Sequence, residues 1–184
     1  MSAANAMEVD RNRTIDDTDQ KDVTQFDARK FRDVVGNFAS GIVIVTSTQG
    51  DEPVGLTCQS FYSVSLEPPL VSFSVSTSSS TYPKVRDAGR FCVNLLAGSQ
   101  YGVSTQFAMS GTDKWAGVSW RPADSGNPII AGALGWIDCS IEDEYLAGDH
   151  FIVLGRVRAI CIENLDEEPL LYFRGQYRHL RAVN

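Results

Sequence analysis

The chain has 184 residues, 43% of them hydrophobic and 21% charged, which is the composition of one globular domain of ordinary size. Its formal net charge of −7, from 16 basic and 23 acidic side chains, makes nucleic acid and anionic membranes unfavourable partners. No apolar run approaches the roughly 20 residues that a transmembrane helix needs, so we expect no membrane partner.

The four cysteines are scattered and form no C-x-x-C pair. This spacing excludes zinc-ribbon, iron–sulfur and thioredoxin-type sites. The N-terminus shows no secretory signal, so we expect a cytoplasmic protein with reduced thiols. We expect all four to be buried as small hydrophobic residues: Cys58, Cys92, Cys139 and Cys161.

Residues 1–24 contain almost no large apolar side chains and carry six acidic against three basic residues. This composition predicts a disordered acidic arm, with a subunit-clasping role as the alternative. A single domain then covers residues 25–184.

The ordered part begins with a helix in which Phe31, Val34, Val35 and Phe38 share one face, and Gly36 interrupts it. Short strand-like runs separated by glycine and proline turns follow over residues 41–45, 54–66, 70–75 and 91–96.

A helix over residues 99–109 and a long Trp/Gly/Pro loop through residue 128 come next. A hairpin then pairs residues 137–145 with 151–162 around a Gly148 turn. Many strands, few helices and no βαβ alternation predict a mainly β barrel with a few attached helices.

Several familiar catalytic motifs are absent from the sequence. There is no G-x-G-x-x-G, no G-x-x-x-x-G-K-[ST] and no G-x-S-x-G. The two histidines, His150 and His179, belong to no H-E-x-x-H helix. Hydrolytic and metal chemistry therefore have little support, and we expect no metal site.

The hydroxyl-rich segment 76–81 runs into a predicted helix that has Thr81 as its N-cap, Pro83 in its first turn and Gly89 at its end. Backbone N–H groups at the helix start, together with hydroxyls and nearby Lys84, would form an anion site that needs no net positive charge. A flexible serine loop with an ordinary cap is the alternative.

Two further features stand out. In the period-two run 54–66, Ser60 falls on the apolar face and Phe61 on the polar one, which indicates a bulge or bend that re-aims side chains, or else a barrel corner without a ligand. His150 follows a Gly148–Asp149 turn at the head of a strand, where a solvated or turn-bonded histidine is the alternative to a functional one.

Six segments in a fixed order carry a family resemblance: residues 38–46, 54–61, 65–70, 91–96, the turn 148–150 and the strand end 155–157. Together they resemble the flavin reductase family with the FMN-binding split-barrel fold, in particular the small reductase components of two-component flavin-dependent monooxygenases. The resemblance spans residues 28–178. It implies a Greek-key-like split β-barrel that forms a homodimer and binds FMN or FAD near the subunit contact.

The resemblance also implies roles for particular residues. The isoalloxazine and ribityl chain would lie beside Thr57, Cys58, Gln59 and Ser60. The phosphate would bind in the serine loop, at Ser79, Ser80 and Thr81. The turn at Ser40 and Gly41 and the helix residue Phe107 would lie near the ring. His150 matches the histidine beside the nicotinamide, and Tyr172, Arg174 and Tyr177 match a less regular pattern on the same side. Residues 76–80 hold only hydroxyls where many relatives carry a Lys or Arg, which leaves both FMN and FAD open.

The implied activity is that of an NAD(P)H:flavin oxidoreductase, which transfers hydride from NADH or NADPH to FMN or FAD and supplies reduced flavin to a separate oxygenase. Such a transfer needs two stacked rings held face to face and no strong acid or base, in agreement with the missing catalytic motifs. His150 is therefore the one catalytic candidate. The absence of a clear arginine pair for a 2′-phosphate favours NADH.

Two alternatives remain from the sequence. One is a split-barrel protein that only binds flavin or haem without turnover. The other is an oxidase of a phosphorylated vitamin precursor, which would need several Arg and Lys residues around a second phosphate that this chain does not cluster.

Overall fold

The computed structural model describes residues 27–180. The predicted acidic arm, residues 1–24, lies outside the described residues, as do both ends of the predicted domain. The helices are α1 (Ala28–Val35), α2 (Tyr82–Ala88) and α3 (Tyr101–Ala108), the last preceded by a 3₁₀ turn (Gly98–Gln100).

The strands are β1 (Ser40–Gly41), β2 (Val43–Gln49), β3 (Glu52–Cys58), β4 (Tyr62–Leu66), β5 (Pro69–Ser76), β6 (Arg90–Leu95), β7 (Trp120–Pro122), β8 (Pro128–Ile130), β9 (Gly135–Ala147), β10 (His150–Ile162), β11 (Leu171–Phe173) and β12 (Gln176–Arg178).

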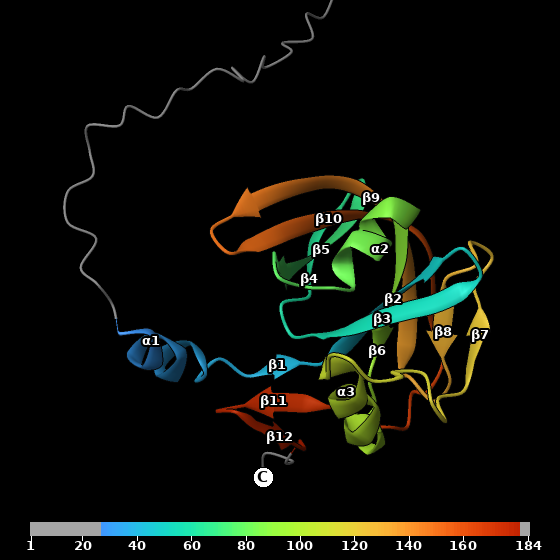
Figure 1. Cartoon of the computed structure of the whole chain (residues 1–184). Coiled ribbons are helices and arrows are strands. Elements are labelled where there is room, and N and C mark those ends of the chain that lie inside the picture. The colour runs from blue at the N-terminus through green and yellow to red at the C-terminus, as the bar shows by residue number, and fades with distance from the viewer. Residues whose placement is uncertain (1–26, 181–184) are drawn as a thin grey trace, which may run out of the picture.

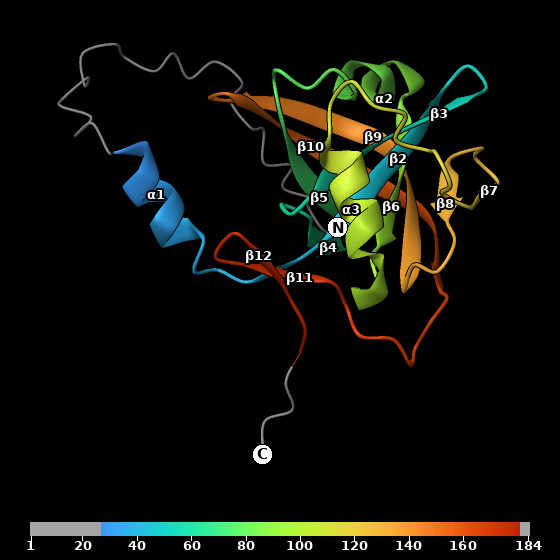
Figure 2. The same ribbon diagram turned by 60° about the horizontal axis from the view of Figure 1, so that its bottom comes forward.

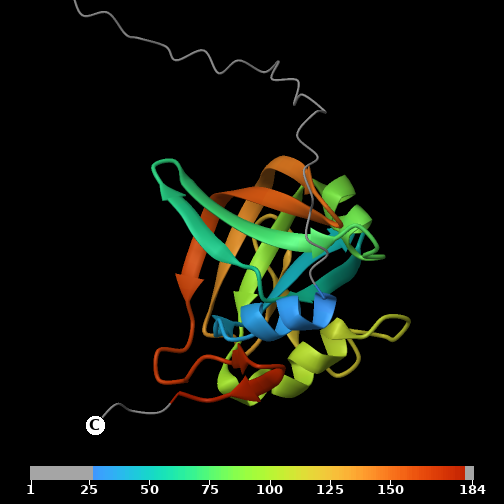
Figure 3. The same ribbon diagram turned by 90° about the vertical axis from the view of Figure 1, so that its left-hand side faces the viewer.

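Seven antiparallel strands form the main sheet, in the order β3-β2-β6-β9-β10-β5-β4. The sheet curls round on itself, and α2 and α3 lie on either side of β3 (Figures 1 and 3). The outer strands β3 and β4 follow each other in the chain but are not paired, so the barrel is open between them. The predicted mainly β split barrel is confirmed.

The barrel interior is filled by the inward-facing side chains of all its long strands. Phe73 packs edge-on against Phe91 at a ring-centroid distance of 5.1 Å and against Tyr82 at 6.3 Å. Gly155 is required by this packing, since a Cβ atom there would lie 2.4 Å from Cζ of Phe91.

A smaller three-stranded sheet lies at one end of the barrel, beside α3 (Figure 1). Here β1 pairs with β11, with Ser40 opposite Tyr172, and β11 pairs with β12. Figures 1 and 2 show these short strands at the same end of the barrel as α3. A second apolar cluster, which includes Phe107 and Leu170, joins this layer to β2.

The first helix stands away from the barrel (Figure 1). It begins at Ala28, with Asp27 accepting a hydrogen bond from the Arg29 N–H, and it ends at Val35 before Gly36. None of its residues is buried, and Phe31 and Val34 on its apolar face are 60% and 64% exposed. The predicted helix is confirmed, but its apolar face does not pack against this barrel.

Three expectations need correction. The run 54–66 is two strands, because the chain turns away at residues 59–61. The loop before residue 128 contains the short pair β7–β8. Cys161 is exposed, unlike the other three cysteines, because β10 beyond Arg156 pairs only with β9 and leaves the barrel.

No helix between residues 27 and 180 is long and apolar enough to cross a membrane.

Candidate active site

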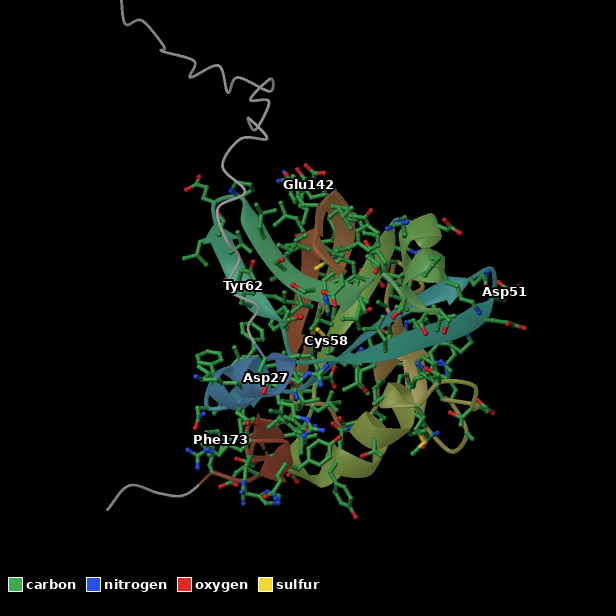
Figure 4. The ribbon with its side chains drawn as sticks, turned by 60° about the vertical axis from the view of Figure 1, so that its left-hand side comes forward. Asp27, Asp51, Cys58, Tyr62, Glu142 and Phe173 are labelled. Carbon is green, nitrogen blue, oxygen red and sulfur yellow. The ribbon has the colours of Figure 1, made fainter. Side chains whose placement is uncertain are left out.

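A pocket of about 500 Å³ opens where β3 ends, between the serine-rich segment and the C-terminal end of α3. This volume falls in the range of about 300–1,000 Å³ that is usual for small-molecule sites. The lining residues are Leu56, Thr57, Cys58, Gln59, Ser60, Ser74, Val75, Ser76, Ser78, Ser79, Ser80, Thr81, Phe107, Ala108, Ser110, Lys114 and His150. Figure 4 shows Cys58 near the middle of the molecule, far from Asp51 at the tip of the β2–β3 hairpin.

The break between β3 and β4 forms one side of the pocket. The Ser60 hydroxyl donates to the Ser74 carbonyl at 2.9 Å and accepts from the Ser74 N–H at 2.7 Å. The sulfur of Cys58 lies 3.1 Å from the same hydroxyl. The Ser60 side chain thus makes the hydrogen bonds to β5 that backbone groups of a continuous strand would make. The predicted bend at Ser60 and Phe61 is confirmed.

The Cys58 thiol faces the pocket without being reactive. Burial raises its pKa, and this effect exceeds the opposing hydrogen bonds from Ser60 and Ser74. Because the thiolate is the nucleophilic form, a raised pKa keeps this sulfur neutral at pH 7. Cys58 therefore contributes an uncharged side chain to the pocket lining.

The opposite side of the pocket is fixed by contacts between β3 and α3. Thr57 donates its hydroxyl proton to the Ser104 carbonyl at 2.6 Å. The fully buried ring of Phe107 lies directly over Gly55, where a Cβ atom would be 2.6 Å from Cε1 of the ring. Only glycine at position 55 lets the aromatic side chain approach the strand this closely.

The serine-rich segment is folded by its own hydroxyls. Thr81 is the N-cap residue of α2, as predicted, but its side chain makes no cap hydrogen bond; the Ser79 hydroxyl instead accepts from the Tyr82 N–H at 3.1 Å. The predicted start of the helix and its end at Gly89, with φ of 66°, are confirmed. With seven residues α2 is short, so the anion-binding capacity of this segment depends mainly on its hydroxyls.

The β9–β10 turn holds the serine-rich segment from the other side. The Asp149 carbonyl accepts from both the N–H and the hydroxyl of Thr77, at 2.9 and 3.1 Å. Nδ1 of His150 lies 2.7 Å from Oδ1 of Asp149, and this hydrogen bond lowers the pKa of the Asp149 carboxyl. Since His150 pairs with Ser76 across the sheet, its ring lies beside the segment.

The cation in the pocket is Lys114, which no pattern in the sequence singled out. Its Nζ lies 3.3 Å from the Gly55 carbonyl and 3.4 Å from the Thr81 hydroxyl. Burial lowers the pKa of Lys114. Lys84, expected in this role, lies on α2 and does not line the pocket.

The remaining sequence-predicted residues lie outside this pocket. Ser40 and Gly41 border a neighbouring hollow of about 650 Å³, and Tyr172 and Arg174 border another of about 350 Å³. Gln59 lines all three, so the hollows meet at this side chain.

Tyr177 lines none of these hollows and contacts α3. Its hydroxyl lies 3.0 Å from that of Ser104 and 3.2 Å from that of Thr105. Tyr177 therefore contacts α3 without lining the pocket, and its ring packs edge-on against Tyr172 at 5.4 Å.

Comparisons with known proteins give the pocket its context. A family model described as a flavin reductase like domain matches residues 35–181. The reductase subunit HsaB of a flavin-dependent monooxygenase of Mycobacterium tuberculosis (strain CDC 1551 / Oshkosh) is 44% identical over 154 residues, or 83% of this chain and 82% of HsaB.

Two solved structures are similar over most of their length. Nitrilotriacetate monooxygenase component B from Mycobacterium thermoresistibile has a TM-score of 0.81 and 43% identity, over 83% of this chain and 86% of its own. The NADH:FAD oxidoreductase SgcE6 of Streptomyces globisporus C-1027, solved in complex with NAD and FAD fragments, has a TM-score of 0.79 and 35% identity, over 84% of this chain and 93% of its own.

Proposed function

This chain belongs to the flavin reductase family and is an NAD(P)H-dependent flavin reductase, and we propose that the pocket at the break between β3 and β4 holds the flavin it reduces. The observation that carries this proposal is the convergence of nine of the residues assigned to flavin or nicotinamide by resemblance. They come from distant parts of the chain and line one pocket: Thr57, Cys58, Gln59, Ser60, Ser79, Ser80, Thr81, Phe107 and His150.

The chemistry of the lining fits a flavin phosphate ester. Leu56, Val75 and Phe107 provide apolar surface for a planar ring system, whereas the hydroxyls of residues 78–81 and the ammonium of Lys114 gather polar donors in the serine-rich part. None of the lining residues described carries a carboxylate that would repel a phosphate. A bound flavin there supplies a hydride acceptor, and the protein contributes position and electrostatics.

The residues around the pocket act by holding the two rings together. Ser60 and Thr57 are fixed by hydrogen bonds to the backbone, so the surface they present is rigid before any ligand arrives. Such pre-organisation lowers the entropic cost of bringing two reactants into contact. His150, oriented by Asp149, is proposed to position the nicotinamide.

NADH is the proposed donor, and FMN or FAD the acceptor. SgcE6 is described as an NADH:FAD oxidoreductase, which supports this choice. Tyr172 and Arg174 are proposed on the nicotinamide side, because their hollow meets the pocket at Gln59.

A homodimer is proposed from the exposed apolar side chains of α1, of Phe38 just after it, and of β4. Phe38 and Leu66 are 82% and 89% exposed, and Val35 and Phe38 border the same hollow as Phe61 and Tyr62. An amphipathic helix gains most of its stability from burying its apolar face, and a second copy would bury it. Light scattering should give twice the chain mass, whereas a monomer at micromolar concentration would contradict the proposal.

The proposed physiological role is to supply reduced flavin to a separate oxygenase, in line with the names of HsaB and of the nitrilotriacetate component. The cytoplasmic location expected from the sequence stays a prediction.

The activity is tested by mixing purified protein anaerobically with NADH and FMN or FAD. Bleaching of the oxidised flavin band at a rate proportional to protein concentration is the expected result. A stably bound chromophore that NADH does not change would favour the non-catalytic flavin or haem carrier instead. No turnover with either flavin and either nicotinamide would refute the assignment.

A further inference from the structure

We propose that Lys114 binds the phosphate of the flavin and makes this pocket selective for phosphorylated flavins over riboflavin. The inference rests on the proposed function and adds a residue that lies outside the segments carrying the family resemblance. The serine-rich segment itself carries no Lys or Arg. Lys114, in the loop between α3 and β7, would supply the positive charge instead.

The position of Lys114 supports this role. Its ammonium reaches β3 through the Gly55 carbonyl and the serine-rich segment through the Thr81 hydroxyl. Both partners are neutral and both distances exceed 3.2 Å. The ammonium can therefore still donate shorter, charge-assisted hydrogen bonds to an anion.

The charges around Lys114 also favour an anionic ligand. It is the only Lys or Arg among the residues that line the described pocket, and no ion pair of Lys114 occurs between residues 27 and 180. The nearest acidic side chain in sequence, Asp113, instead accepts the N–H of Trp115. The lowered pKa of Lys114 is what a half-buried ammonium without an opposing charge shows.

The loop that carries Lys114 is held in place before a ligand arrives. The side-chain amide of Gln106 on α3 donates to the carbonyls of Lys114 and Ala116, at 3.0 and 2.9 Å. A cation anchored in this way pays less entropy on binding than a lysine on a free loop. Because the net charge of −7 repels a phosphate, a local cation favours its binding.

The test compares the affinities of FMN and riboflavin, which differ only in the phosphate. Lys114→Met removes the charge at similar length, and Lys114→Arg retains it. For Lys114→Met we expect FMN to bind about 10- to 100-fold more weakly, the size expected for losing a charge-assisted hydrogen bond. Riboflavin should bind as it does to the unaltered protein. Lys114→Arg should restore most FMN affinity.

Ionic strength gives a second measurement that does not depend on the variants' stability. FMN affinity of the unaltered protein should fall with added salt more steeply than riboflavin affinity, and Lys114→Met should remove this difference. Lys84→Met tests the rival lysine on α2 in the same assay.

The outcomes separate the possible roles. Equal weakening of FMN and riboflavin by Lys114→Met, or no weakening of either, overturns the assignment, as would a loss of FMN affinity confined to Lys84→Met. If the unaltered protein neither binds nor reduces FMN, FAD or riboflavin, the proposed function itself fails.

Discussion

The contact between Gly55 and Phe107 allows a quantitative prediction for Gly55→Ala. The new Cβ atom would lie 2.6 Å from Cε1 and 2.9 Å from Cδ1 of Phe107, and 3.3 Å from the Val45 carbonyl oxygen. The ring cannot retreat freely, since it is fully buried and packs edge-on against Trp115 at 4.8 Å. Overpacking of this kind costs about 1–3 kcal/mol.

For a domain of this size, 1 kcal/mol corresponds to roughly 2–4 °C in Tm, so we expect Gly55→Ala to melt about 2–12 °C lower. Because Phe107 lines the flavin pocket, the variant should also bind FMN more weakly. Differential scanning fluorimetry and flavin fluorescence quenching measure the two effects on the same samples.

Gly102→Ala is the matched control, because Gly102 lies on α3 with nothing within 4 Å of its new Cβ. Alanine is the better helix former, so this variant should melt at the same temperature or slightly higher. Combining Gly55→Ala with Phe107→Leu should cost less than the sum of the two single changes, as expected for residues in direct contact. Unchanged melting and FMN affinity in Gly55→Ala, or strict additivity in the double variant, would refute the close-packing argument.

Three further outcomes are expected. His150→Ala should raise the KM for NADH while leaving FMN affinity near normal, and an unchanged NADH KM and rate would show its role to be misassigned. Gly155→Ala should lower the urea midpoint by at least as much as Gly55→Ala, because its Cβ would lie 2.4 Å from Phe91 inside the barrel; a midpoint equal to that of the unaltered protein would contradict this. Burial and the hydrogen bond to Glu144 raise the pKa of Tyr82. Its contribution to stability is thus complete below about pH 10 and shrinks above it, as the unfolded tyrosine ionises first. The stability difference between the unaltered protein and Tyr82→Phe should therefore narrow above pH 10, and a constant difference would count against this mechanism.

Much of the fold follows from local patterns in the sequence. The hairpin around Gly148 and the helix between Pro83 and Gly89 were predictable, because alternation and turn residues act over a few neighbouring positions. The break in the alternating pattern at Ser60 and Phe61 was visible in the sequence for the same reason. Its partner Ser74 was not, because the hydrogen bonds that replace the strand ladder join residues 14 positions apart.

The sequence by itself determined the mainly β class, the family and nine of the residues that line the pocket. The tertiary structure alone decided which residues meet: it brought His150 to the serine-rich segment, left Tyr177 outside the pocket and placed Lys114 rather than Lys84 at the pocket. Lys84 is close to that segment in the chain, whereas Lys114 reaches it only because α3 packs on β3. Such a position depends on long-range packing, and local sequence patterns carry no information about it.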